Sequence, residues 1–401
     1  MESTACTSIR KCPSCSGERA EILTGLRFRV FDDCPLEGSF SFVSCLSCGF
    51  CYYDTPSRAE AFEAYYRGNA YYFSAATAGS GGCSEGELKR YERTADCISR
   101  YIDGKGRNIF DIGCGKGGLI LTLKSKGFSN LYAVDALPEC VEYIRNNLGI
   151  ISEVGRAENL PFPDIKPDCL IYSHVLEHVL SPRDVLMEAW NRLEEKGLVY
   201  IEVPDASRYG EFSGFPLSEL YLEHVNHFDI EHLRVTVESM GFSTVETGDK
   251  ILEEGTDAAV PCIYGLFRKS EIKAEIKPDL KLASVLKEYF SECEKSRLYG
   301  VIKEIALSGK PVYVWGLSQY AQLLLGQTSL GDCCIKAYVD GDVHKQSKTI
   351  GGMRIFPPDV LKEALPSDYV VLTGINYRRQ MRLYLDSIGF RGTEIRLQEE
   401  Y

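Results

Sequence analysis

Apolar and polar residues follow one another along the middle of the chain in an order that predicts strand, helix and strand. Residues 109–112 and 131–134 are apolar runs of strand length, and residues 118–128 carry leucines and a phenylalanine at intervals that suit one buried helix face. A glycine-rich turn at residues 113–117 joins the first strand to the helix. The pattern therefore predicts a βαβ unit at the centre of an α/β fold.

The chemistry of that turn narrows its ligand. Gly113, Gly115 and Gly117 allow the backbone to turn tightly and to approach a ligand closely. Asp135 ends the second strand, where a carboxylate accepts hydrogen bonds from both ribose hydroxyls. Asp111 precedes the first glycine, and its charge would repel a pyrophosphate but attract the sulfonium and ammonium groups of S-adenosylmethionine. The turn favours that cofactor over a dinucleotide; a packing turn in a ligand-free sheet is the alternative.

The same alternation continues to the end of the chain. Further strands are predicted near 151–154, 169–172, 198–203 and 262–267, with helices over 138–147 and 184–193 and a helix that Asp229 caps and Gly241 stops. A polar helix over 85–102 precedes the first strand, and residues 279–308 predict one long helix before a second βαβ unit.

Length and composition limit the number of domains and the classes of partner. With 401 residues the chain is expected to hold two or three domains, on the scale of about 100 to 200 residues per domain. A net charge of −12 argues against nucleic acid as the main partner, since phosphate binding needs clustered lysine and arginine. Without a membrane-length apolar run or a signal peptide, we expect no membrane partner and a cytoplasmic location.

Four of the 16 cysteines form two C-x-x-C pairs, Cys12 with Cys15 and Cys45 with Cys48. Paired knuckles of this kind present four thiolates tetrahedrally, the geometry that a structural Zn²⁺ ion prefers. The segment between them alternates like a hairpin, so we predict a zinc ribbon over residues 1–60, whose metal removal would unfold this module alone. Cys34 and Cys51 are alternative ligands, and four free thiols are the alternative without metal.

A first group of histidines follows the predicted strand 169–172. The sequence His174-Val-Leu-Glu177-His178 has the H-x-x-E-H spacing known from zinc enzymes, but the serine-proline pair that follows would stop a helix at once. Residues at the carboxyl end of a sheet strand face the ligand crevice. We therefore favour polar contacts from His174 to the cofactor over metal binding.

A second group of histidines is our candidate for the chemistry. Only six histidines occur in the chain, and His224, His227 and His232 lie within one short segment. A histidine can accept a proton near neutral pH, and a carboxylate such as Glu223 can orient it. Adjacent side chains in an extended segment point apart, so direct pairing of Glu223 with His224 stays open, and a structural histidine is the alternative.

With its glycine turn, Asp135, the VLEH segment and the cysteine pairs, the chain resembles class I S-adenosylmethionine-dependent methyltransferases. From Cys12 onward it is similar to three-part C-methyltransferases that act on nucleotide-linked keto-deoxysugars. The resemblance implies a Rossmann-like seven-stranded methyltransferase sheet at 61–268, a small zinc ribbon before it, and a second Rossmann-like domain at 269–401. It implies a small-molecule substrate, S-adenosylmethionine as cofactor and Zn²⁺ as a structural ion.

The resemblance also assigns residues. It places Ala136, Ala157 and Glu158 beside the cofactor, the last two over the adenine. It assigns catalysis to Tyr221, Glu223 and His224, with Tyr72 from the tyrosine-rich loop that follows the ribbon. The implied reaction starts when His224 removes a proton from carbon next to a ketone, which leaves an enolate to attack the methyl group. Whether carbon or oxygen is methylated stays open.

The C-terminal third offers candidate substrate contacts. Ser318, Asp340 and Asn376 end predicted strands of the second βαβ region, and they are expected to hold a nucleotide or sugar together with His227. A single glycine in this second turn, at Gly316, argues against a second dinucleotide site.

Other classes of function compete with an enzyme that uses S-adenosylmethionine. One is a binding module in which the ribbon docks onto a protein or nucleic acid and the sheet is a scaffold. Another is an NAD-dependent oxidoreductase built on the C-terminal half. Transfer to oxygen or nitrogen of another small molecule is the alternative within the enzyme class.

Overall fold

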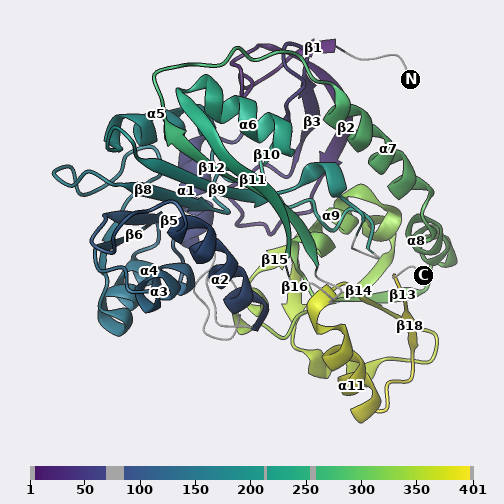
Figure 1. Ribbon diagram of the computed structural model, residues 1–401. Coiled ribbons are helices and arrows are strands. Elements are labelled where there is room, and N and C mark those ends of the chain that lie inside the picture. Colours follow the sequence, from purple (N-terminus) through teal and green to yellow (C-terminus); the bar gives the residue numbers. More distant parts are fainter. Residues whose placement is uncertain (1–4, 69–84, 212–214, 253–258, 398–401) are drawn as a thin grey trace.

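A computed structural model of the protein describes residues 5–68, 85–211, 215–252 and 259–397. Within these ranges the chain forms three sheets of five, seven and six strands (Figure 1). No helix in these ranges is both long and apolar enough to cross a membrane.

The seven-stranded sheet is built around the predicted βαβ unit. Its order is β11-β12-β9-β8-β5-β6-β7, with parallel pairing among β5 to β9 and antiparallel pairing of β12 with β9 and β11. The strands are β5 (Ile109–Ile112), β6 (Leu131–Asp135), β7 (Ile151–Val154), β8 (Cys169–Ser173), β9 (Leu198–Pro204), β11 (Phe242–Leu252) and β12 (Val260–Lys269). The chain turns from β5 first to β6 and later to β8 on its other side. That reversal is where α/β sheets bind ligands.

Helices cover this sheet where the apolar periodicity predicts them. They are α2 (Glu85–Ser99), α3 (Gly118–Ser125), α4 (Pro138–Tyr143), α5 (Pro182–Arg192) and α6 (Ile230–Ser239). The predicted caps are confirmed at α6: the Asp229 carboxylate accepts the His232 N–H at 2.7 Å, and Gly241 follows with φ +95°. The helix predicted over 138–147 becomes π-helical from residue 144 to residue 148.

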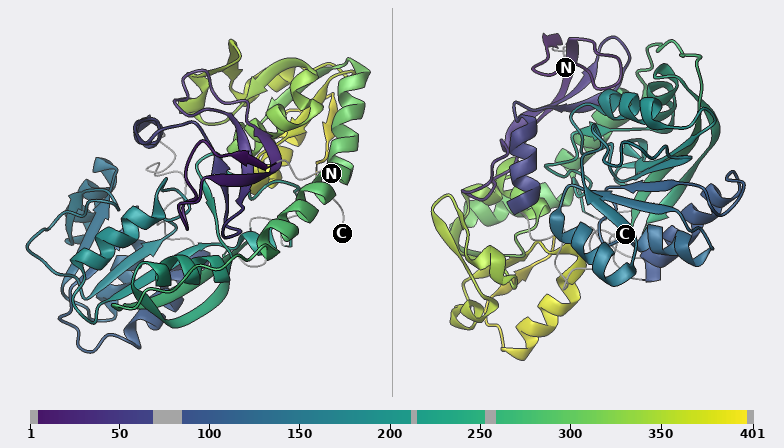
Figure 2. Two further views of the ribbon diagram at one scale, coloured as in Figure 1. Left: turned by 90° about the horizontal axis from the view of Figure 1, so that it is seen from above. Right: turned by 90° about the vertical axis from the view of Figure 1, so that its left-hand side faces the viewer.

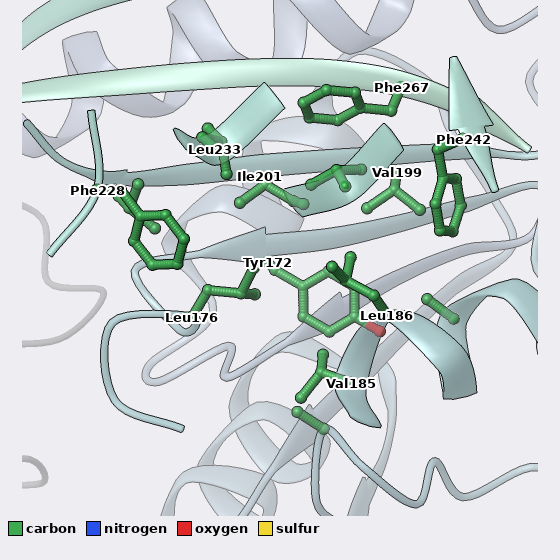
Figure 3. Close-up of a cluster of buried hydrophobic side chains, with 14 of the residues drawn as sticks. Tyr172, Leu176, Val185, Leu186, Val199, Ile201, Phe228, Leu233, Phe242 and Phe267 are labelled. Carbon is green, nitrogen blue, oxygen red and sulfur yellow. The ribbon is translucent and has the colours of Figure 1, made fainter. Parts of the chain in front are cut away.

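The core of this sheet extends into the segments that carry the candidate chemistry. Leu176, from the His174–His178 segment, and Phe228, from the end of the second histidine segment, are buried among Tyr172, Ile201 and Leu233 (Figure 3). Both segments are therefore anchored by apolar side chains in one core, which fixes where their polar side chains emerge.

The predicted hairpin between the cysteine pairs is confirmed. β2 (Arg19–Arg27) pairs with β3 (Ser39–Cys45), and β1 (Ala5–Thr7) and β4 (Cys51–Asp54) complete the N-terminal part of the five-stranded sheet. Its last strand, β10 (Asn226–His227), comes from the segment between β9 and α6 and pairs with β4.

The ribbon is not a separate module. Cys12, Cys48, Phe50 and Tyr52 belong to the same buried cluster as the seven-stranded sheet. We therefore no longer expect metal loss to unfold the ribbon alone. Unfolding of the ribbon would also remove apolar contacts from the core of the seven-stranded sheet.

The second βαβ region forms the six-stranded sheet, in the order β15-β16-β14-β13-β17-β18. Its strands are β13 (Pro311–Trp315), β14 (Cys334–Val339), β15 (Thr349–Ile350), β16 (Met353–Phe356), β17 (Tyr369–Leu372) and β18 (Thr393–Ile395), with helices α9 (Gln319–Gln327), α10 (Val343–Gln346) and α11 (Arg378–Ser387). The ribbon strands lie between this sheet and the seven-stranded one (Figure 2), and the Arg27 N–H donates to Gln327 at 3.0 Å.

Two predicted elements differ in the structure. The long helix over 279–308 is divided into α7 (Lys281–Lys295) and α8 (Arg297–Ser308), because Ser296 has extended dihedrals (φ −63°, ψ 153°). The tyrosine-rich stretch begins as a helix, α1 (Ala59–Gly68), so Tyr65 and Tyr66 lie on a helix face and not in a loop. Tyr72 lies outside the described residues.

Candidate functional site

The two cysteine pairs converge, as their spacing predicts. Cys12 Sγ lies 3.6 Å from Cys48 Sγ, and Cys15 Sγ lies 3.5 Å from Cys45 Sγ. Zn–S bonds of about 2.3 Å put neighbouring sulfurs of a tetrahedral site about 3.8 Å apart. Four thiols this close cannot all ionise without a cation, so the donor set fits a structural Zn²⁺ ion. The alternatives Cys34 and Cys51 are not in the cluster.

The glycine turn has the conformation that its sequence predicts. Gly113, Gly115 and Gly117 have φ of +70°, +51° and +79°, a region that side chains disfavour. A Cβ on Gly113 would lie 2.7 Å from a methyl of Val175, so space is lacking as well. The turn opens at the carboxyl ends of β5 and β6, where a cofactor is expected.

Asp135 is bound to this turn. Its carboxylate accepts the Gly115 N–H and the Leu137 N–H, each at 2.9 Å, so the side chain is fixed before a ligand arrives. Each carboxylate oxygen keeps a further lone pair for a ribose hydroxyl.

Asp111 lies at the end of β5 and is 3% exposed. Burial, with the charge of Asp135 nearby, raises the pKa of Asp111 to about 7, while the cation of Arg90 opposes this rise. A carboxylate in this state gains from a cationic ligand, which would return it to its ionised form.

The predicted adenine side follows β6 and β7. Ala136 is exposed, Ala157 is buried, and Glu158 lies 3.7 Å from Arg156. The ring of Phe162, in the loop that follows, lies against Phe110 with centroids 5.6 Å apart.

His174 is held by carboxylates on both sides. Its Nδ1 lies 3.0 Å from Glu177 Oε1, and its Nε2 lies 3.4 Å from Glu202 Oε1. Burial alone would lower the pKa of His174, but contacts with Cys262 and the two carboxylates raise it well above the usual value. Both ring nitrogens are thus used within the protein, and His174 has φ +58°, an uncommon conformation for histidine.

The carboxylate beyond His174 belongs to a buried ion network. Glu202 is fully buried and accepts a hydrogen bond from Lys250 Nζ at 2.7 Å, while Tyr200 and Thr94 also contact this lysine. Burial by itself would raise the pKa of Glu202, but Lys250 and His174 lower it well below its usual value. Glu202 is thus paired with two groups that can carry positive charge, which offsets the cost of burying a carboxylate.

The ring of His224, in the second histidine segment, lies against the ring of His178 in the first. The ring centroids of His224 and His178 are 4.6 Å apart with planes at 87°, and Tyr221 lies 4.7 Å from His224 on another side. Burial and the neighbouring histidines lower the pKa of His224 well below its usual value. At neutral pH its imidazole is therefore uncharged and has a free lone pair to accept a proton.

Two other elements, α1 and α9, border this cluster. From α1, the Tyr66 hydroxyl lies 3.1 Å from His178 Nδ1, and Tyr65 donates to Glu223 at 3.5 Å. From α9 of the C-terminal region, Gln319 donates to Tyr65 at 3.1 Å and accepts the Leu222 N–H at 2.7 Å. Glu223 thus contacts Tyr65, whereas the His224 ring lies against His178 and Tyr221.

Arg10 and Asn226 join the two segments. Asn226 Nδ2 donates to the carbonyls of Leu176 and Val179, at 2.7 and 2.6 Å, and its own N–H donates to the Glu177 carbonyl at 3.1 Å. Arg10 from the ribbon donates to the side chain of Asn226 at 3.1 Å and to the Leu180 carbonyl at 2.5 Å. The ribbon therefore holds the relative position of His178 and His224.

The other two histidines of the segment are structural in their surroundings. His227 is 1% exposed, lies between the rings of Phe42 and Tyr53, and contacts the Tyr209 hydroxyl at 2.9 Å. His232 is held by the Asp229 carboxylate at 2.8 Å. In this conformation His227 presents no surface to a substrate.

The candidate substrate residues of the C-terminal sheet have partners of their own. Ser318 caps α9 by accepting the Ala321 N–H at 3.4 Å. Asp340 accepts the Leu317 N–H at 2.7 Å and pairs with Lys345 at 3.1 Å. The side chain of Asn376 lies outside the described part of the chain. Ser318 precedes Gln319, so this end of the sheet does border the His224 cluster.

Several residues of the site escape the sequence reasoning. Glu177 and His178 belong to a motif that the sequence shows, but their partner His224 is far along the chain. Tyr66 belongs to the tyrosine-rich stretch. Arg10 and Gln319 come from other parts of the fold, and no local pattern marks them.

Metal removal gives the first test. We expect one tightly bound Zn²⁺ ion per chain by elemental analysis, and we expect Cys48→Ser to lose it. Because the ribbon shares the core of the main sheet, the variant should lower the melting temperature of the whole chain, on the order of 10 °C. Exposed Cys334→Ser is the matched control. A metal content near zero in the unmodified protein would contradict the zinc assignment.

The joint between ribbon and site gives the second test. Arg10→Met should leave partly buried carbonyls without donors and reduce the free energy of unfolding by about 2–4 kcal/mol, measured by urea denaturation. Exposed Arg19→Met should change it by less than about 0.5 kcal/mol. Equal effects of the two substitutions would show that the contacts of Arg10 have no special weight.

Comparison with known families agrees with this geometry. A family model described as methyltransferase domain matches residues 87–247, and one described as C-methyltransferase C-terminal domain matches residues 269–395.

Curated relatives match only the central region. An ajmaline N-methyltransferase of Rauvolfia serpentina is 29% identical over 128 residues, which are 29% of this chain and 44% of that protein. A ubiquinone biosynthesis O-methyltransferase of Rickettsia bellii is 30% identical over 133 residues, 31% of this chain and 53% of that protein. An uncharacterized transposon protein of Streptomyces fradiae is 32% identical over 128 residues, 30% of this chain and 37% of that protein. The chain thus spans about half or less of the length of these relatives.

Among solved structures, a protein of Pyrococcus horikoshii is 17% identical with a TM-score of 0.40, over 50% of this chain and 99% of that one. A SAM-dependent methyltransferase of Methanosarcina mazei is 19% identical with a TM-score of 0.38, over 43% of this chain and 97% of that one.

The two matched regions together cover well over half of the chain, and the first of them contains the glycine turn with Asp135. The chain belongs to the class I S-adenosylmethionine-dependent methyltransferases and carries a C-terminal domain of the C-methyltransferase type.

Proposed function

We propose that the protein transfers the methyl group of S-adenosylmethionine to a carbon atom of a small keto compound, with a nucleotide-linked keto-deoxysugar as the substrate class. The observation that carries the proposal is His224, an imidazole kept uncharged by burial beside Tyr221 and His178. The C-methyltransferase C-terminal domain supports transfer to carbon.

The donor would lie across the carboxyl ends of β5 and β6. Asp135 would accept the ribose hydroxyls, and the glycines at 113, 115 and 117 would let the backbone approach the donor. Asp111 would face the sulfonium and ammonium groups of the donor. Arg90, whose Nε has no hydrogen-bond partner among the described residues, would pair with the carboxylate of the donor. Ala136, Ala157 and Glu158 would border the adenine.

His224 would then act on the acceptor. Its free lone pair takes a proton from the carbon beside a ketone, and the electrons of that C–H bond form an enolate. The enolate carbon attacks the methyl group, a C–C bond forms, and the S–CH₃ bond breaks with its electron pair left on sulfur. A sulfonium methyl is already electrophilic, so the protein's part is to make the nucleophile and to align it.

Nearby groups would support the protonated base. Glu177 lies in the same cluster as His224 and is buried, so its charge favours the imidazolium that forms. Tyr221 lies over the His224 ring, where its hydroxyl could contact the acceptor, and we keep Glu223 and Tyr72 as further catalytic candidates.

The C-terminal domain would hold the remote part of the substrate. We assign residues 1–60 to the ribbon, 61–268 to the methyltransferase domain and 269–401 to substrate binding, with Ser318, Asp340 and Asn376 as candidate contacts. His227, the fourth candidate, is buried between Phe42 and Tyr53 and would act only through its neighbours. Gln319, which bonds to the Leu222 backbone, supports a substrate that spans both domains. The pairing of Asp340 with Lys345 disfavours an NAD site there.

Methylation of oxygen or nitrogen is the second candidate. It is favoured by the names of the matched relatives, which are an O-methyltransferase and an N-methyltransferase. Incubation with labelled S-adenosylmethionine and a panel of nucleotide-linked keto sugars distinguishes the two, since the carbon resonance of a methyl group on carbon lies well upfield of that of a methyl group on oxygen or nitrogen.

Replacement of the base tests the mechanism. His224→Ala should bind S-adenosylmethionine with the affinity of the unmodified protein but lose at least about 10²-fold in turnover, because general base catalysis contributes factors of this size. Calorimetry and single-turnover methyl transfer measure the two effects separately. Exposed His344→Ala, on α10, is the comparison. A near-normal rate in His224→Ala would move the role of base to another group.

The charge state of Asp111 should be visible in binding. Below pH 7 Asp111 is mainly protonated, and above it the carboxylate attracts the sulfonium. S-adenosylhomocysteine has the same amino and carboxyl groups but a neutral sulfur. The affinity for S-adenosylmethionine relative to S-adenosylhomocysteine should therefore rise up to about 10-fold between pH 6 and pH 8. Asp111→Asn should make this ratio independent of pH, and a ratio that rises equally in the variant would contradict the assignment.

A further inference from the structure

Glu177 has one carboxylate oxygen that the surrounding protein does not use. The residue is 1% exposed, and its Oε1 contacts His174 at 3.0 Å. Its Oε2 is buried and has no hydrogen-bond partner in the described part of the chain. A buried, unsatisfied charged oxygen is costly, so its presence points to a ligand.

Two imidazoles complete a set of possible ligands around it. One ligand atom each of Glu177, His178 and His224 lies within 4.8 Å of the others. His178 Nε2 is 4.0 Å from Glu177 Oε1. Metal bonds of about 2.0–2.2 Å to nitrogen and oxygen place neighbouring ligand atoms about 3–3.5 Å apart. Side-chain rotations that move these ligand atoms by about 1 Å would therefore bring all three within bonding distance of one ion.

The surroundings orient two of the three ligands in advance. The Tyr66 hydroxyl lies 3.1 Å from His178 Nδ1, which leaves His178 Nε2 for a metal. His174 holds the other oxygen of Glu177, and His174 is itself held by Glu202. Metal-binding histidines and carboxylates in proteins are usually fixed by such outer contacts.

The ligand types select the ion. Two imidazoles and one carboxylate suit Zn²⁺, Co²⁺ and Ni²⁺, whereas Mg²⁺ and Ca²⁺ prefer oxygen ligands only. The set differs from the four cysteines of the ribbon, which hold an ion entirely by sulfur. It also differs from the H-x-x-E-H arrangement of the sequence, because His224 replaces His174 as the second histidine.

We propose that Glu177, His178 and His224 form a second metal site, for a borderline divalent cation such as Zn²⁺, and that an ion bound there stops methyl transfer. The inhibitory part rests on the proposed function, in which His224 is the base. A lone pair that binds a metal ion cannot accept a proton from the substrate, so the ion and the reaction exclude each other.

Cobalt titration tests the site without reference to activity. The full chain, with its ribbon filled by Zn²⁺, should bind one added Co²⁺ ion, with visible absorption of cobalt but without the intense sulfur-to-cobalt band of a thiolate site. Added Zn²⁺ should displace it. Glu177→Gln, which preserves shape, and His178→Ala should each weaken Co²⁺ binding at least about 10-fold, whereas His344→Ala, on the exposed face of α10, should not.

Inhibition provides the second measurement. Zn²⁺ should inhibit methyl transfer over the same concentrations at which it displaces Co²⁺, and a chelator too weak to remove the ribbon ion should restore the rate. His344→Ala should be inhibited like the unmodified protein, and His178→Ala should need more Zn²⁺ relative to its own rate.

Each outcome bears on a separate part of the proposal. No added Co²⁺ bound, or binding unchanged in both Glu177→Gln and His178→Ala, overturns the metal site and leaves the methyltransferase proposal untouched. Co²⁺ binding that depends on Glu177 and His178 while methyl transfer continues at full rate overturns the inhibitory role, and it argues against His224 as the base.

Discussion

The relative position of His178 and His224 depends on a small set of hydrogen bonds around Asn226. The side chain of Asn226 donates to two carbonyls of the segment that carries His178. Asn226 itself begins β10, two residues after His224. Arg10 closes the arrangement from the ribbon side. Because buried carbonyls need donors, the two segments can separate only at a cost, and the ring pair keeps its geometry without a direct bond between the imidazoles.

This joint gives the ribbon a role beyond its own stability. The cysteine cluster of the ribbon is buried in the core of the central sheet, and its strand β4 pairs with β10 directly beside the candidate base. An ion held by the four thiolates would take no part in chemistry, since it would have no open position. It would nevertheless help to assemble the site, because Arg10 lies only two residues before Cys12.

A chain of alternating charges leads from Lys250 towards the candidate site. Lys250 neutralises Glu202, His174 lies between Glu202 and Glu177, and the chain of contacts ends at Glu177, whose Oε2 has no hydrogen-bond partner among the described residues. On the cofactor side, burial raises the pKa of Asp111 to about 7. Both positions are prepared for a cation: a sulfonium at the first, and an imidazolium or a metal ion at the second.

The sequence by itself determined the βαβ unit, the glycine turn with Asp135, the cysteine cluster and the cap of α6, because each depends on residues close together in the chain or on a strict spacing. It also marked His224, but it could not separate His224 from His227 and His232, which differ only in their surroundings. Tertiary structure decided that. It buried His227 between aromatic rings. It paired both ring nitrogens of His174 with carboxylates, so that neither is free for the cofactor. It also brought Glu177 and Arg10 close to the segment of His224, which is more than forty residues away from either in the sequence. Such contacts follow from how sheets and loops pack in space, and no local pattern of polar and apolar residues encodes them.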